Sequence, residues 1–237
     1  MSKKPRKKPS DVASRIEAHP GTQMLRAFQS CEIAKEGFEI SALQVRRLIL
    51  SLEDPRSPLT AAWPGDRDKL EASFQEVFRR FLQFLGAVHA LVERTEKVIH
   101  EDFVPEAHRV EHRAAAESAF TGPAARFLHD FRTYLRHRAA PAMVLIRHDV
   151  PRPKLIELLI DAPEMLHWGK WTSPARSYLH QFQFKLPVLR MIDGHEQRAR
   201  TFYHRFVQQF RRHHKADMDS AAALMEELHG PSSCPLQ

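Results

Sequence analysis

The stretch Phe127–Pro141, FLHDFRTYLRHRAAP, organises the rest of this chain. Its apolar residues recur at helical spacing, which predicts a helix over about Ala124–Ala140. Pro141 disfavours helical geometry in the residue before it, so the predicted helix ends there. Winding at about 100° per residue gathers the large apolar side chains on one side, namely Phe127, Phe131, Tyr134 and Leu135. We expect this side to face a hydrophobic core.

The remaining circumference of this predicted helix is polar and mostly cationic. Two neighbouring strips divide it: Arg126, Asp130, Thr133 and His137 on one, and His129, Arg132 and Arg136 on the other. A solvent-facing surface has this composition, and so does an anion-binding site that a neighbouring helix or chain covers. The residues alone leave both interpretations open.

Composition predicts the fold class. The 237 residues include only 8 Gly and three Tyr, and Ala, Leu, Arg, Glu and Gln are abundant, which favours helices over sheet. We predict an all-α protein in which residues 11–230 form a single antiparallel bundle of about five or six main helices. It would contain at most one very short β-hairpin, near residues 142–186. Residues 231–237 would be a frayed C-terminus.

Helical periodicity and the positions of Pro and Gly divide the chain into predicted elements. The predicted helices are, approximately, Asp11–Leu52 with an interruption near Pro20-Gly21, Asp66–His100, Glu106–Phe120, Ala124–Ala140, Lys154–Ile160, Pro174–Gln181, Pro187–Lys215 and Asp217–Leu228. In the helix that ends at Lys215, the expected buried edge consists of Phe202, Phe206, Val207 and Phe210.

The region between the central helix and the C-terminal helices is less regular. Residues 142–146 fit either a strand or a buried connection, and residues 182–186 alternate as a strand does. Trp168 and Trp171 lie in a predicted loop, residues 161–173. We expect this loop to be tucked against the helices, because two exposed indole rings would otherwise need a partner.

The net charge of +7 is concentrated at the N-terminus. Residues 1–10 carry no acidic side chain and five basic ones, Lys3, Lys4, Arg6, Lys7 and Lys8, so subtracting these five charges leaves +2 for the rest. We expect residues 1–10 to be a disordered basic tail that aids solubility. The nearly balanced body therefore gives little electrostatic reason to assume a nucleic-acid partner.

Cysteine usage and hydropathy predict a cytoplasmic protein. Cys31 and Cys234 are far apart and form no Cys-x-x-Cys pair, so we expect reduced thiols and neither a disulfide nor a zinc site. No apolar run reaches the length that a bilayer requires, since Gln83 and His89 interrupt even Phe81–Val92. The basic N-terminal residues are not followed by a hydrophobic segment, as a secretory signal would be. We therefore expect no membrane partner.

The segment Arg132–His137, RTYLRH, consists of an Arg, a spacer of four residues and a His near the end of a helix. This pattern resembles the signature of the HEPN superfamily, all-helical domains in which a spacer of about four to six residues separates the Arg from the His. The segment is also similar to a group of bacterial helical proteins in which Leu-Arg-Asn-Tyr precedes a His. Thr133 stands where those proteins commonly have Asn, a departure that affects substrate positioning.

The resemblance implies a metal-independent RNA endonuclease, or an inactive relative that serves as an interaction module. It also implies a homodimer in which two motifs meet across the interface, with RNA as the partner and no metal or cofactor. Arg132 would clamp a phosphate, because a guanidinium fork suits phosphoryl oxygens. His137 would be the general acid or base, since imidazole titrates near neutral pH, and Asp130 would orient it. The substrate-binding residues would be His129, Thr133 and Arg136.

Two features leave alternatives open. A straight helix places Arg132 and His137 about 140° apart, so they reach one phosphate only if the helix distorts or if they serve different chains. His108 and His112 have the spacing of metal ligands on a helix, but no third ligand is evident, and we expect a structural role for them. The alternative function is a non-enzymatic helical interaction or scaffold protein that uses the same face of the bundle for a protein partner.

Overall fold

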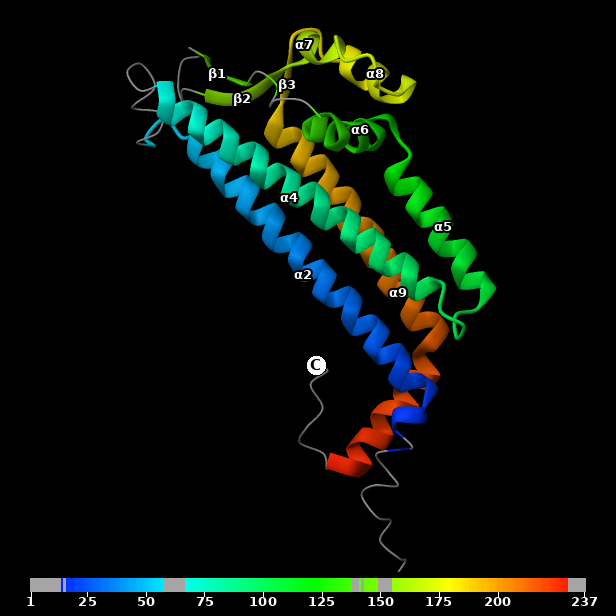
Figure 1. Cartoon of the computed structure of the whole chain (residues 1–237). Coiled ribbons are helices and arrows are strands. Elements are labelled where there is room, and N and C mark those ends of the chain that lie inside the picture. The colour runs from blue at the N-terminus through cyan, green and yellow to red at the C-terminus, as the bar shows by residue number, and fades with distance from the viewer. Residues whose placement is uncertain are drawn as a thin grey trace, which may run out of the picture.

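The computed structural model describes residues 14, 16–57, 67–137, 141, 143–148 and 155–229. Three long helices run side by side along the molecule, as Figure 1 shows: α2 (Pro20–Glu53), α4 (Arg67–Ile99) and α9 (Val188–His229). Helix α2 packs against both α4 and α9, and α5 (Glu106–Phe120) packs against α9. The helical bundle predicted from composition is confirmed.

The shorter elements gather at one end of this bundle, the upper end in Figure 1. They are α6 (Pro123–His137), α7 (Ala162–Leu166), α8 (Ser173–His180) and the strands β1 (Met143–His148), β2 (Leu155–Asp161) and β3 (Lys185–Pro187). Helix α6 contacts α8 on one side and α4 and α5 on another. This position places α6 between the small elements and the long helices.

The strands form an antiparallel sheet in the order β1-β2-β3, so the expected hairpin is extended by a third strand. Ile160 pairs with Met143 on one side and with Leu186 on the other. The predicted helix Lys154–Ile160 is wrong, because β2 occupies this segment. A short run of Leu and Ile has no periodicity that separates a buried strand from a buried helix. Pairing on both sides then supplies backbone hydrogen bonds that a helix would otherwise make.

Helix α9 is continuous over 42 residues, whereas the sequence predicts two helices that meet near Ala216. The predicted break is wrong for a local reason. The tripeptide Lys215-Ala216-Asp217 contains neither Pro nor Gly, and Ala has the highest helix propensity of all residues. The expected buried edge of this helix is confirmed for three phenylalanines, and its fourth member is half-buried: Phe202, Phe206 and Phe210, with Val207.

The dipeptide Pro20-Gly21, predicted as an interruption, marks the start of α2. His19 caps this end of the helix, and its Nδ1 accepts a hydrogen bond from the backbone N–H of Gly21 at 3.1 Å. The C-terminal half of α9 crosses here. A Cβ atom at position 21 would lie 2.0 Å from the carbonyl oxygen of Asp217 and 2.8 Å from Cβ of Ala221. The crossing therefore requires glycine.

Aromatic side chains fill the core where α6 meets α8. The ring of Phe127 stacks on Trp171 and Tyr178, at 5.5 and 5.1 Å between centroids. Trp168 packs edge-on against Trp171 at 4.7 Å, and Trp171 Nε1 donates a hydrogen bond to the carbonyl of Met165 at 2.6 Å. Both indoles are buried, which confirms that this region is tucked against the helices.

Several expectations concern residues outside the described ranges, namely the tail 1–10, the C-terminus 231–237, the predicted end of the central helix at residues 138–140, and Cys234. Within the described ranges, the predicted loop 161–173 contains the short helix α7. Cys31 is buried as a free thiol. None of the described helices combines the length and the hydropathy of a membrane span.

Candidate functional site

Helix α6 presents two contrasting faces. Phe127 and Phe131 are fully buried on its apolar side, and the ring of Phe131 lies 5.6 Å from that of Phe81 in α4. The amphipathic helix predicted for this segment is therefore confirmed. The other face borders a pocket, and three of its residues, spaced by three positions, are part of the lining: Arg126, His129 and Arg132.

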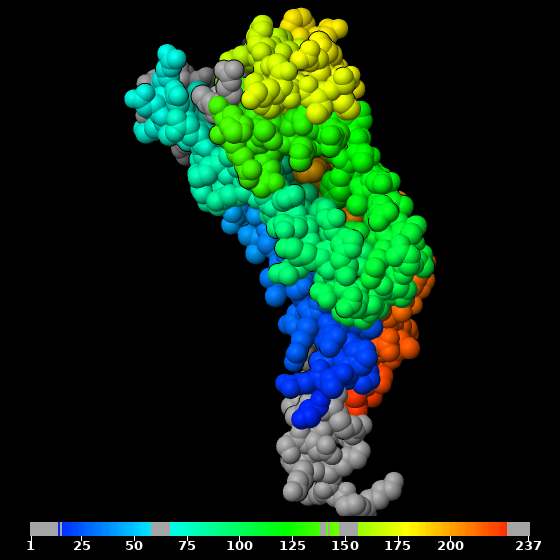
Figure 2. Space-filling model, turned by 45° about the vertical axis from the view of Figure 1, so that its right-hand side comes forward, coloured from blue at the N-terminus to red at the C-terminus, as the bar shows by residue number. Residues whose placement is uncertain are grey.

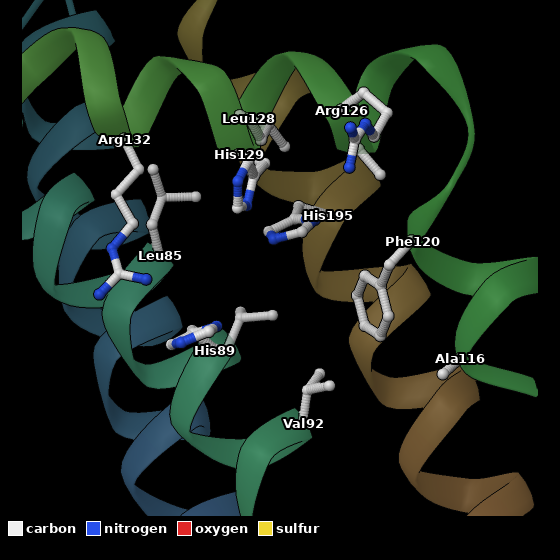
Figure 3. A pocket seen from close by; sticks show the side chains of 12 residues that line it. Leu85, His89, Val92, Ala116, Phe120, Arg126, Leu128, His129, Arg132 and His195 are labelled. Carbon is white, nitrogen blue, oxygen red and sulfur yellow. The ribbon is translucent and has the colours of Figure 1, made fainter. Parts of the chain in front are cut away.

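The pocket is a hollow of about 200 Å³ between α4, α5, α6 and α9. Figure 2 shows it from outside, with orange atoms of α9 at its floor between the green surfaces around it. In Figure 3, Arg132 and His129 extend from α6 into the space that His89 of α4 and His195 of α9 also border. The apolar part of the lining consists of Leu85, Val88, Val92, Ala116, Phe120, Ala125 and Leu128.

The polar part of this lining is cationic or neutral. Among the described residues that border the pocket, none is Asp or Glu. Within the described part of the chain, neither Arg126 nor Arg132 forms an ion pair with a carboxylate. Partial burial lowers the pKa of the Arg132 guanidinium, and the positive charge of Arg136 contributes in the same direction. An anion in the pocket would relieve this repulsion and use guanidinium donors that have no carboxylate acceptor among the described residues.

His195 forms the floor of the pocket and is almost fully buried. Its ring packs edge-on against Phe84 and Phe120, at 5.8 and 6.0 Å between centroids. Burial, and then the positive charge of Arg198, lower the pKa of His195 to about 3. At neutral pH this imidazole is therefore uncharged, and it offers polar ring atoms without adding to the positive charge above it.

The structure brings two of the predicted site residues together and leaves three outside the pocket. Arg132 and His129 are part of the lining, whereas Thr133, Arg136 and His137 are exposed on α6 and are not. Because α6 is a continuous helix as far as His137, Arg132 and His137 point to different sides of it. A single chain therefore does not unite the predicted clamp with the predicted acid or base.

Asp130 has a different place from the one expected for it. Its carboxylate is buried, and Oδ2 accepts hydrogen bonds from the backbone N–H of Thr172 at 2.9 Å and from its hydroxyl at 2.7 Å. Thr172 is the N-cap residue of α8, so Asp130 satisfies a donor at the start of that helix. These two hydrogen bonds go to Thr172 rather than to His137, and they fix α6 against α8.

Three residues that line the pocket, His89, Arg126 and His195, are not among the site residues predicted from the sequence. Arg126 lay on the neighbouring polar strip, but the other two come from helices far along the chain. His89 lies at an exposed position of α4, where it looks like any solvent-facing residue. The one available signal was a histidine at an inward position of α9, three residues after Ile192 and four before Ala199, both of which are buried.

His108 and His112 are buried in the core between α5 and α9. His112 Nε2 lies 3.1 Å from the Thr95 hydroxyl, and the ring of His108 stacks on that of His213 at 4.9 Å between centroids. The described residues hold no group of three or more His, Cys, Asp or Glu side chains that could bind a metal ion. The spacing of His108 and His112 is that of two inward positions on one amphipathic helix.

Comparison with family models, with curated proteins and with solved structures gives no match to this chain. The distinguishing feature of the pocket is the combination of two arginines with exposed imidazoles. None of the described residues that line it is acidic.

Proposed function

We propose that this pocket binds a phosphate group of single-stranded RNA. The observation that supports the proposal most directly is the pair Arg126 and Arg132, which border one hollow and have no carboxylate partner among the described residues. A guanidinium presents a planar fork of donors that matches two phosphate oxygens. His89 and His129 add further donors at the same opening.

The shape of the pocket is suited to a small anionic group. Its volume of about 200 Å³ is below the range of about 300–1,000 Å³ that holds a drug-sized ligand. Apolar side chains of α4 and α5, including Val92 and Phe120, border the cationic rim and give a ribose or a base a surface to pack on. A single nucleotide of an unpaired strand therefore fits better than a duplex, whose phosphates follow a rigid helix.

The HEPN resemblance enters the proposal through Arg132, which keeps its role as the phosphate clamp. The activity that follows is metal-independent RNA cleavage, in which a ribose 2′-oxygen attacks phosphorus and the 5′-oxygen of the next nucleotide leaves. One base removes the 2′-hydroxyl proton and one acid protonates the leaving oxygen. In a single chain, the imidazoles beside Arg132 are His89 and His129, so these two supply the acid and the base. His137 would contribute only from a second protomer.

Binding is tested by fluorescence anisotropy with a labelled single-stranded RNA. We expect Arg126→Gln and Arg132→Gln each to weaken binding about tenfold, the effect of losing one charge-assisted contact. Arg113→Gln is the matched control, because Arg113 is exposed on α5 and lies outside the pocket. Equal affinity in all four proteins would contradict the proposal.

Cleavage is tested separately, by incubating the protein with a mixed RNA pool in EDTA and analysing the ends of the products. The expected products carry 2′,3′-cyclic phosphate and 5′-hydroxyl ends, and they disappear in His89→Gln and His129→Gln. Loss of cleavage in His137→Gln alone would instead assign the acid or base to the motif histidine. RNA binding without cleavage would leave an RNA-binding protein, and absence of both would favour the non-enzymatic interaction protein.

A further inference from the structure

The outer face of α2 carries a line of exposed apolar side chains. Ile33, Ile40, Leu43 and Leu50 are 65%, 57%, 45% and 48% exposed, respectively. The opposite face of α2 is buried against α4 and α9, and α2 forms one edge of the bundle in Figure 1. We call this line, together with Glu36 and Arg47 between its apolar members, the α2 strip.

The spacing of the α2 strip is regular. Its six positions, 33, 36, 40, 43, 47 and 50, are separated by alternating steps of three and four residues. This is the a and d spacing of a heptad repeat, which forms the contact line between two coiled helices. A helix that served only to cover its own bundle would need no second line of this kind on its solvent side.

The α2 strip is complementary to a second copy of itself that runs in the opposite direction. If a second α2 lies antiparallel on the first, with the two-fold axis between Ser41 and Ala42, Ile33 faces Leu50 of the partner subunit. In the same register Ile40 faces Leu43 of the partner subunit, and Glu36 faces Arg47 of the partner subunit. Every layer thus pairs apolar with apolar or acid with base.

Charge also selects the direction of pairing. A parallel helix in register would place Glu36 against its own copy and Arg47 against its own copy, which is repulsive. Within the described part of the chain, neither Glu36 nor Arg47 forms an ion pair. The charges beside the strip differ, because they are paired within the chain: Lys35 with Glu39 at 2.9 Å, and Arg46 with Glu196 at 2.6 Å.

From this self-complementarity we infer that the α2 strip is the interface of an antiparallel homodimer. The partner is a second copy of this chain, and the Glu36–Arg47 layers fix its register. None of the residues that line the α4–α5–α6–α9 pocket belongs to α2, so the pocket stays open in each protomer. The inference is therefore independent of the proposed RNA binding.

The oligomeric state is measured by sedimentation equilibrium over a range of protein concentrations. We expect a dimer for the wild type and a monomer for Ile40→Asp and Leu43→Asp, each with an unchanged circular dichroism spectrum. Val110→Asp is the control, because Val110 is equally exposed, at 55%, but lies on α5. A wild type that stays monomeric at every concentration would overturn the inference, as would a dimer that survives both strip variants.

The register is tested by exchanging the charges. Glu36→Arg and Arg47→Glu should each weaken the dimer at least about tenfold, and the double variant should restore it. Mixing the two single variants should give a heterodimer, since both charged layers then again pair opposite signs. A dimer that is insensitive to both single exchanges would refute the antiparallel register. Unchanged RNA affinity in Ile40→Asp would confirm that dimer formation and RNA binding are separate properties.

Discussion

The arginines between α2 and α9 and those of the α6 pocket differ in what they face. Arg46 of α2 forms ion pairs with Asp193 and Glu196 of α9 at 2.8 and 2.6 Å, and Arg200 pairs with Glu196 at 2.9 Å. Arg132 borders a hollow that lacks described acidic residues. Paired arginines hold helices together, whereas an arginine without an acid in reach is available to an anion from outside.

An acid placed in the pocket would remove this difference, and we expect it to have the largest effect. His89→Glu puts a carboxylate across the pocket from Arg132, as Figure 3 shows for the two native side chains. RNA affinity should fall about 100-fold, or about 3 kcal/mol, because the guanidinium then pairs within the chain. Ala90→Glu makes a comparable charge change at the next, exposed position of α4. Equal losses of affinity in the two variants would assign binding to net charge instead of to the pocket.

Acidification tests the floor of the same pocket. Since burial lowers the pKa of His195 to about 3, the unfolded chain binds a proton below about pH 6.5 and the folded chain does not. The free energy of unfolding should therefore decrease as the pH falls from 6.5 toward 3. His195 alone should contribute on the order of 3 kcal/mol of this decrease by pH 4, because each pH unit below 6.5 lowers the free energy of unfolding by about 1.4 kcal/mol.

Urea denaturation at a series of pH values measures this contribution. His195→Leu should reduce the slope of the unfolding free energy against pH between 6.5 and 4, while His180→Leu, at an exposed position of α8, should not. A smaller slope remains in His195→Leu, because burial also lowers the pKa values of His108 and His112. The slope is the quantity to compare, because the substitution itself also changes packing. An identical slope in the wild type and in His195→Leu would contradict the prediction.

Removing the carboxylate that pairs with the arginines between α2 and α9 should have a smaller effect. The change should lower stability rather than RNA affinity. Glu196 is largely buried, and although burial opposes it, the hydrogen bonds from Arg46 and Arg200 lower the pKa of Glu196. Glu196→Gln should reduce the free energy of unfolding by about 1–2 kcal/mol and leave RNA affinity unchanged. The control is Glu93→Gln, which breaks an exposed pair with Lys97 and should leave the free energy of unfolding nearly unchanged, because solvent screens that pair. A loss of RNA affinity in Glu196→Gln would show that the two regions are not independent.

The parts of the fold that follow from helical periodicity were predictable from the sequence. The two-faced character of α6 and the buried phenylalanines of α9 follow from spacing alone. Strand β2 does not, because a run of Leu and Ile is compatible with either structure until its neighbours are known. The continuity of α9 past Ala216 follows from the absence of a helix breaker, which outweighs the change in apolar pattern that suggested two helices.

The pocket was harder to predict than the helix that forms its roof. Residues 89, 129 and 195 come from three helices, and no local pattern indicates that these helices converge. The Arg-x4-His spacing drew attention to Arg132, which does border the pocket, and to His137, which does not. Two residues of a short motif can act together from one helix only if they lie on the same side of it. Arg132 and His137 are five positions apart, so they lie on different sides of α6.

The continuity of α9 has a consequence for how this chain can vary in length. The same helix carries His195 at the pocket floor and Ala221 at the Gly21 crossing, 26 positions and about 39 Å farther along. Inserting or deleting one residue between them would turn the distal part by about 100°, and Ala221 would leave the glycine. Related chains should therefore tolerate changes of length in their loops but conserve the number of residues in this interval.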